Sequence, residues 1–189
     1  MKPIHVIPLP CGAAGGGPAG RCEPGLDLLE FLAAALARLF RTPCQIRPEI
    51  LEIAFAFDEG RSQYHSTAIL QRLERAGDPD ARMLGVTAGD LYVPVLTFVF
   101  GEAQLDGNCA AVSTARLREE FYGLPPREEL LRERLLKTAT HELGHTFGLR
   151  HCSDWRCVMS SSHGVERLDV KGADFCAACR KPVLNERYW

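Results

Sequence analysis

The sequence lacks any hydrophobic segment long enough to serve as an export signal or a membrane anchor. The apolar positions of residues 1–10 are interrupted by His5 and by prolines, so they do not form the continuous apolar core of a signal peptide. The best apolar stretch, residues 26–40, contains three charged residues and is too short to span a bilayer. We therefore expect a cytoplasmic protein with no membrane partner.

The chain also lacks a strong charge of either sign. Its 22 lysines and arginines nearly balance 24 aspartates and glutamates, which gives a net charge of -2 and no electrostatic case for nucleic acid. A hydrophobic content of 46% and a charged content of 24% are typical of soluble globular proteins and argue against disorder. A chain of 189 residues can bury a real core. We expect one folded unit that acts as a monomer.

Apolar periodicity predicts an α+β fold. Helical spacing predicts helices over residues 25–41 and 64–76, and a third from Pro125-Pro126 to about residue 149. Short apolar runs separated by turn residues predict strands at residues 4–9, 83–87, 96–100 and 110–114. Beyond Gly148 the chain becomes polar and rich in cysteine. We therefore divide it into an N-terminal part, 1–148, and a small C-terminal subdomain, 149–189.

Residues 141–151 read His-Glu-Leu-Gly-His-Thr-Phe-Gly-Leu-Arg-His. His141 and His145, four residues apart on a helix, project from one face and can bind one metal ion. Glu142 is one position out of register with them, where a general base belongs. An accidental histidine pair on a helix surface is the alternative. However, the five fixed positions of the motif, which are His141, Glu142, His145, Gly148 and His151, would carry these residue types by chance only about once in ten million windows.

Gly148 predicts how a third ligand reaches the same ion. Glycine adopts positive φ at a helix C-terminus without steric cost, so the chain can fold back and bring His151 to the metal. Three neutral nitrogen ligands leave a fourth position for water, which is the arrangement of a catalytic zinc site. The motif thus predicts a zinc-activated water with Glu142 as its base.

Eight cysteines are unevenly distributed, and four of them lie within the last part of the chain: Cys152, Cys157, Cys176 and Cys179. Their C-x4-C and C-x2-C spacing favours a structural zinc site, with disulfides or a redox pair as the alternatives. Because neighbouring residues in an extended chain point opposite ways, His151 and Cys152 would couple the two metal sites. Of the others, Cys44 and Cys109 are predicted to be buried thiols, and Cys11 and Cys22 can pair under oxidation.

The extended histidine motif followed by Met159 resembles the metzincins. Its direct continuation into the cysteine cluster resembles the archaemetzincins in particular. The resemblance implies a compact zincin-like fold, with a mixed twisted sheet, an active-site helix and a zinc-stapled C-terminal subdomain. It also implies that Met159 forms a hydrophobic floor under the zinc ligands. Residues 96–101 would form the outer strand along which a peptide binds.

In some metzincins a tyrosine follows this methionine and assists the reaction. Here Ser160-Ser161-Ser162-His163 follows it instead. That role is therefore absent or filled by another side chain, and Tyr92 and His163 are the candidates.

These observations together predict a zinc-dependent metallopeptidase that hydrolyses peptide or protein substrates and carries two zinc ions, one catalytic and one structural. A catalytically weak or inactive peptide-binding module on the same scaffold is the main alternative. A zinc-ribbon interaction protein with an incidental histidine motif is a further one, although residues 152–180 lack the basic patch that nucleic acid would need.

Overall fold

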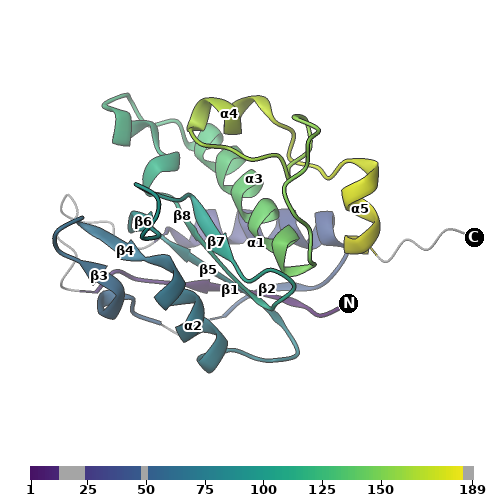
Figure 1. The fold of residues 1–189 in the computed structure, drawn as a ribbon, viewed down its shortest axis with the longest axis horizontal. Coiled ribbons are helices and arrows are strands. Elements are labelled where there is room, and N and C mark those ends of the chain that lie inside the picture. Colours follow the sequence, from purple (N-terminus) through teal and green to yellow (C-terminus); the bar gives the residue numbers. More distant parts are fainter. Residues whose placement is uncertain (13–23, 48–50, 185–189) are drawn as a thin grey trace, which may run out of the picture.

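The computed structural model describes residues 1–12, 24–47 and 51–184, so Cys22 and its expected pairing with Cys11 lie outside the described residues. Strands and helices are interspersed up to residue 113, and the described elements beyond it are helices (Figure 1). The strands are β1 (Ile4–Pro8), β2 (Cys44–Ile46), β3 (Phe57–Asp58), β4 (Gln63–His65), β5 (Arg82–Thr87), β6 (Leu91–Tyr92), β7 (Gly101–Ala103) and β8 (Cys109–Ser113). The helices are α1 (Leu26–Phe40), α2 (Ser66–Ala76), α3 (Glu128–Thr146), α4 (Val165–Val170) and α5 (Ala177–Leu184).

Five strands form the central sheet, in the order β2-β1-β5-β8-β7. The first four are parallel, and β7 runs antiparallel to β8 at the edge. Parallel strands are covered on both faces, which explains why β5 and β8 are almost wholly buried. An edge strand such as β7 presents backbone N–H and C=O groups along its outer side. A second, small sheet has the order β3-β4-β6.

Helices cover both faces of the central sheet. Alternate residues of β8 enter different cores, since Ala110 and Val112 pack with α1 and α3 whereas Cys109 and Ala111 pack with α2. Figure 1 shows α1 and α3 on one side of the sheet and α2 on the other. The active-site helix predicted by the histidine motif therefore has one side in the larger core.

The three predicted helices are confirmed as α1, α2 and α3, with ends within three residues of those predicted. The second begins later than predicted because residues 63–65 pair as β4 with β3 and β6 before the helix starts. None of the helices in the described parts of the chain is both long and apolar enough to cross a membrane.

The prediction of a strand at residues 96–100 was wrong. This segment makes one isolated bridge to β6, and the amide of Ser113 donates to the Phe100 carbonyl oxygen; side chains also contact it. Gln63 donates from Nε2 to the carbonyl oxygen of Thr97 at 3.0 Å, and the Arg116 guanidinium lies 4.1 Å from the ring centroid of Phe98. These contacts hold the apolar run as a loop, so the edge strand is β7.

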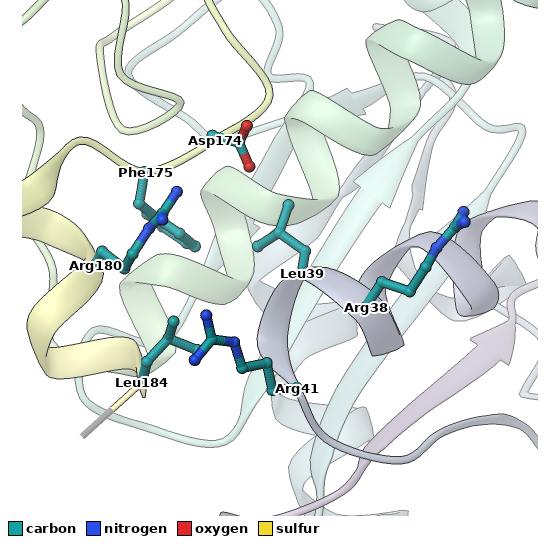
Figure 2. Close-up of a pocket in the computed structure, with 7 residues that line it drawn as sticks. All are labelled: Arg38, Leu39, Arg41, Asp174, Phe175, Arg180 and Leu184. Atoms are coloured by element: carbon teal, nitrogen blue, oxygen red, sulfur yellow. The ribbon is translucent and has the colours of Figure 1, made fainter. Parts of the chain in front are cut away.

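The C-terminal segment, residues 149–184, shares the larger core with α1 and α3. Phe175 stands edge-on to Phe40 of α1, with ring centroids 5.7 Å apart. Between this segment and the end of α1 lies a cavity of about 170 Å³ (Figure 2), lined by Arg38, Leu39, Arg41, Asp174, Phe175, Arg180 and Leu184. The division predicted at residue 148 marks a change in amino-acid composition, but residues on both sides of it belong to the same hydrophobic core.

Arg134 of α3 connects this helix to two other segments. Its buried guanidinium donates to both carboxylate oxygens of Asp169 at 2.7 Å, to Glu119 at 2.7 Å and to the carbonyl oxygen of Leu117 at 2.9 Å. The bonds to Asp169 raise the pKa of Arg134 further above its ordinary value, so it remains charged. Arg134 therefore fixes α3 to the end of α4 and to the turn η3 (Glu119–Tyr122).

Replacing Arg134 with methionine should lower the free energy of unfolding by about 3 kcal/mol, because Asp169 and Glu119 then lose a shared buried cation. Chemical denaturation measures this change. Arg132→Met is the matched control, since Arg132 pairs with Asp27 at 3.4 Å on the surface, where ion pairs contribute at most about 1 kcal/mol. Equal losses in the two variants would contradict the role of Arg134.

Candidate metal centre and active site

Three histidines meet at the C-terminal end of α3. The rings of His141 and His145 lie on successive turns, with centroids 4.7 Å apart. The ring of His151 lies 5.2 Å from that of His141 and 5.1 Å from that of His145. One nitrogen of each ring is within 4.8 Å of the others. The structure therefore brings together the three histidines selected from the sequence.

A Schellman turn closes α3 and returns the chain toward the histidines. The amide of Leu149 donates to the carbonyl oxygen of Gly144, and the amide of Gly148 donates to the backbone carbonyl oxygen of His145. Gly148 has φ of +79°, so the predicted left-handed conformation is confirmed. The same turn directs the Leu149 carbonyl oxygen to Nδ1 of His145, at 2.7 Å.

The hydrogen bonds of the two helical histidines determine their tautomers. Nδ1 of His141 lies 2.8 Å from the carbonyl oxygen of Val158, and Nδ1 of His145 bonds the carbonyl of Leu149. A carbonyl oxygen only accepts, so each Nδ1 is assigned the proton and each Nε2 a lone pair. The two Nε2 atoms are 3.2 Å apart. Two lone pairs at this distance fit a shared cation, and imidazole nitrogen is a preferred zinc ligand.

The environment also favours the neutral form of all three rings. Burial lowers the pKa of His141 to about 3, and burial also lowers the pKa values of His145 and His151. The nearby charge of Lys171 acts in the same direction on each. Neutral imidazole is the form that binds metals, so the site needs no deprotonation to accept one.

Glu142 lies beside the histidines, almost fully buried against the edge strand. A Cβ atom on Gly101 would lie 2.7 Å from Cγ of Glu142 and 2.7 Å from the carbonyl oxygen of Ala111. Gly101 therefore leaves the space that the Glu142 side chain occupies. Burial raises the pKa of Glu142 to about 8; the charge of Lys171 opposes this shift and that of Glu102 adds to it.

Met159 is fully buried beneath the helix that carries the histidines. A Cβ atom on Gly144 would collide with the Met159 sulfur. The glycine between the two helical histidines therefore allows the methionine to approach the helix backbone.

A cleft of about 800 Å³ opens in front of the histidines and Glu142. One wall is the 96–100 loop together with β7, and the other comes from the C-terminal segment. His163 lines this cleft, whereas Tyr92 does not, because its hydroxyl donates to Asp58 at 3.0 Å. The lining is largely apolar along the loop, β7 and the turn that follows it: Leu96, Phe98, Val99, Phe100, Ala103 and Leu105.

The four C-terminal cysteines form a second cluster. Their sulfur atoms all lie within 4.8 Å of one another, and those of Cys152 and Cys176 are 3.9 Å apart. The amide of Cys179 lowers the pKa of Cys176 to about 7, whereas burial raises the pKa values of Cys157 and Cys179. One thiolate is thus stabilised locally, and the four sulfur atoms have the composition and spacing of a four-cysteine zinc site.

The other described cysteines lie away from this cluster. Cys109 is buried as predicted, whereas Cys44 is only partly buried. Cys11 is buried, with its sulfur 3.9 Å from the hydroxyl oxygen of Thr87.

Three residues of the site were not selected from the sequence. Gly101 makes room for Glu142, Glu102 lines the cleft, and Lys171 is a buried residue that also lines it. A glycine beside an apolar run is the one available signal, since it often marks a close approach of backbone. Nothing in the local sequence distinguishes Lys171 from a surface lysine.

The model of the family described as Peptidase family M54 matches residues 45–185. The chain belongs to this family. It is accordingly a zinc metallopeptidase, a hydrolase that acts on peptide or protein substrates.

Curated relatives support the assignment along most of the chain. The archaemetzincin of Methanocaldococcus jannaschii is 44% identical over 159 residues, which are 84% of this chain and 87% of the relative. The archaemetzincin of Methanopyrus kandleri is 47% identical over 124 residues, which are 66% of this chain and 67% of the relative.

Solved structures agree with this fold. A crystal structure of archaemetzincin from Archaeoglobus fulgidus, complexed with malonate, superposes with a TM-score of 0.77 at 34% identity, covering 95% of this chain and 99% of the other. A zinc-dependent peptidase from Methanocorpusculum labreanum gives a TM-score of 0.78 at 27% identity, with the same coverage. The expected zincin-like fold and the resemblance to archaemetzincins are confirmed.

Replacing Gly101 with alanine should displace Glu142, because the added Cβ would lie 2.7 Å from Cγ of that residue. A displacement of about 1 Å at a catalytic group can cost about 100-fold in rate, so, given the role expected for Glu142 from the sequence, we predict that peptide cleavage falls by that order while bound zinc is unchanged. Gly60→Ala is the control, since its Cβ would meet only Asp58 at 3.4 Å. Full activity in Gly101→Ala would refute the claim that Glu142 needs the space left by Gly101.

Proposed function

We propose that His141, His145 and His151 hold the catalytic zinc and that Glu142 is the general base for peptide-bond hydrolysis. The observation that carries this proposal is the pair of Nε2 lone pairs 3.2 Å apart, beside a buried carboxyl group in a large cleft. Zinc bound there supplies a Lewis acid that lowers the pKa of water towards ~7 and polarises the scissile carbonyl.

Glu142 handles the protons of the reaction in this proposal. Its position next to His141, but one residue out of the ligand register, supports a role beside the metal rather than on it. The carboxylate takes a proton from the attacking water and returns it to the leaving amine nitrogen. Burial alone favours the neutral carboxyl, so the positive charges of the bound metal and of Lys171 are what favour the ionised base.

We assign the second zinc to Cys152, Cys157, Cys176 and Cys179. Four sulfur atoms within 4.8 Å of one another support a closed tetrahedral site. Because Cys152 directly follows His151, this structural site would also limit the movement of the third catalytic ligand. Met159, packed against Gly144, is the floor beneath the ligands in this assignment.

We infer that the substrate peptide adds to the sheet as an extended strand antiparallel to β7. The support is that β7 is the sheet edge and lines the cleft that contains the histidines. The apolar wall formed by the 96–100 loop would then receive apolar side chains of the substrate.

We further propose that residues 1–148 carry the sheet and active-site helix while 149–184 supply the floor and the structural metal. A cytoplasmic monomer without a membrane or nucleic-acid partner remains our expectation.

Glu142→Gln should reduce cleavage of a peptide library by about 100- to 10,000-fold, the usual contribution of a general base, while zinc binding is retained. Mass spectrometry of the digests gives the rates. Glu129→Gln, the same change in the exposed first turn of α3, is the control and should cleave normally. If Glu142→Gln cleaves as well as the wild type, the base assignment fails. If neither the wild type nor Glu142→Gln cleaves any peptide of the library, the protein is a peptide-binding scaffold.

Metal analysis should give two zinc ions per chain, falling to one in His141→Ala. Cys176→Ser should lose the structural ion and weaken the catalytic site by about 10-fold, because His151 is no longer held by its neighbour. Cys109→Ser, a buried thiol outside the cluster, should keep both ions. A zinc content that His141→Ala leaves unchanged would refute the catalytic site. Undiminished affinity of that site in Cys176→Ser would refute the coupling.

A further inference from the structure

Three successive carbonyl groups around Met159 each accept a hydrogen bond. Nζ of Lys171 donates to the carbonyl oxygen of Val158 at 2.9 Å and to that of Ser160 at 3.0 Å. The backbone amide of Cys152 donates to the carbonyl oxygen between them, that of Met159, at 2.9 Å. One lysine side chain therefore holds the segment on both sides of the methionine.

Lys171 is an unusual residue for this position. Its side chain is almost fully buried, with 4% of the residue exposed, although it directly follows the short helix α4. Burying an ammonium group is costly unless its protons are paired. The two carbonyl oxygens accept hydrogen bonds from two of its three protons, and the side chain reaches the lining of the active-site cleft.

The Val158 carbonyl links Lys171 to the metal centre. The same oxygen that accepts from Lys171 also accepts from Nδ1 of His141, at 2.8 Å. A carbonyl oxygen has two lone pairs, so both donors are accommodated. The corresponding acceptor for His145 is the carbonyl of Leu149, which the Schellman turn of α3 positions instead. The two helical histidines are thus oriented by independent means.

We propose that Lys171 is a positioning residue of the catalytic metal centre, which holds the Val158 carbonyl so that His141 keeps its Nδ1–H tautomer and directs Nε2 at the metal. This inference rests on the proposed role of His141 as a ligand. Partners that orient a metal-binding histidine typically change metal affinity by about 10- to 100-fold. Lys171 exerts this effect through a shared acceptor.

Lys137 provides a closely matched control. It is equally buried, with 3% exposed, and its Nζ donates to the carbonyl oxygens of Leu168 and Asp169 at 3.1 and 3.0 Å. Both lysines therefore satisfy two carbonyls of the C-terminal segment. Only Lys171 binds the carbonyl that accepts from His141.

The first experiment uses protein with ¹⁵N-labelled histidine, with the cysteine site loaded and the histidine site free of metal, and reads the tautomers by long-range ¹H–¹⁵N NMR. In the wild type, His141 and His145 should both carry the proton on Nδ1. In Lys171→Met, His141 should become a mixture of tautomers whereas His145 is unchanged. Lys137→Met should leave both rings as in the wild type.

The second experiment measures zinc affinity at the histidine site by chelator competition, with zinc itself as the probe and the cysteine site kept loaded. We expect Lys171→Met to weaken binding by about 10- to 100-fold and Lys137→Met by no more than about twofold. If Lys171→Met loses thermal stability but keeps the wild-type tautomers and affinity, the residue is only structural and the inference is overturned.

A conservative variant keeps the inference testable if Lys171→Met does not fold. Lys171→Gln retains an amide donor, so it should keep one of the two carbonyl bonds and give intermediate tautomer populations and affinity. Wild-type values in Lys171→Gln together with wild-type values in Lys137→Met would overturn the inference. His141→Ala separates a failure of the proposed function from a failure of this inference. If His141→Ala keeps the wild-type zinc affinity at the histidine site, the proposed function is refuted. If His141→Ala loses zinc affinity but the Lys171 variants do not, only the inference about Lys171 is refuted.

Discussion

The site depends on two hydrogen bonds from histidine Nδ1 atoms to backbone carbonyls. They leave a lone pair on each Nε2, and the two Nε2 atoms are 3.2 Å apart, a separation that suits two ligands of one cation. The bond from His145 is local, four residues along the chain, and the helix-ending turn makes it. The bond from His141 reaches Val158, seventeen residues away, and requires the C-terminal segment to fold back under α3. Of the two proposed helical ligands, one is therefore oriented by local helix geometry and the other by tertiary packing.

That division explains how much could be predicted from the sequence. Helical spacing places His141 beside His145, and a glycine at a helix end predicts the turn, so these features follow from local geometry. The 96–100 segment was misread because strand propensity is overridden by tertiary context, here contacts from Gln63 and Arg116. The function of Lys171 depends on a loop thirteen residues upstream, and nothing in its neighbours reveals that contact.

Two glycines shape the site by leaving space rather than by conformational freedom. Gly144 admits the Met159 sulfur against α3, and Gly101 admits the Glu142 side chain against the edge strand. Both requirements arise between elements that are far apart in the sequence, so only the packed fold explains them. The strand register explains the second, because Gly101 pairs with Val112, on the face of the sheet that α3 covers.

The histidines also differ in how much the fold prepares them. His141 is nearly buried and His145 partly so, and each has a carbonyl partner, whereas His151 is exposed and follows the helix-ending turn. Ordering an exposed residue costs roughly 1–2 kcal/mol of backbone entropy, which the metal must offset on binding. On the proposed assignment, a metal at the cysteines bears part of this cost in advance. It holds Cys152, whose amide is already bound to the Met159 carbonyl, and thereby restricts the residue before it. The cysteine site thus restricts the backbone of His151, the proposed ligand that the rest of the fold constrains least.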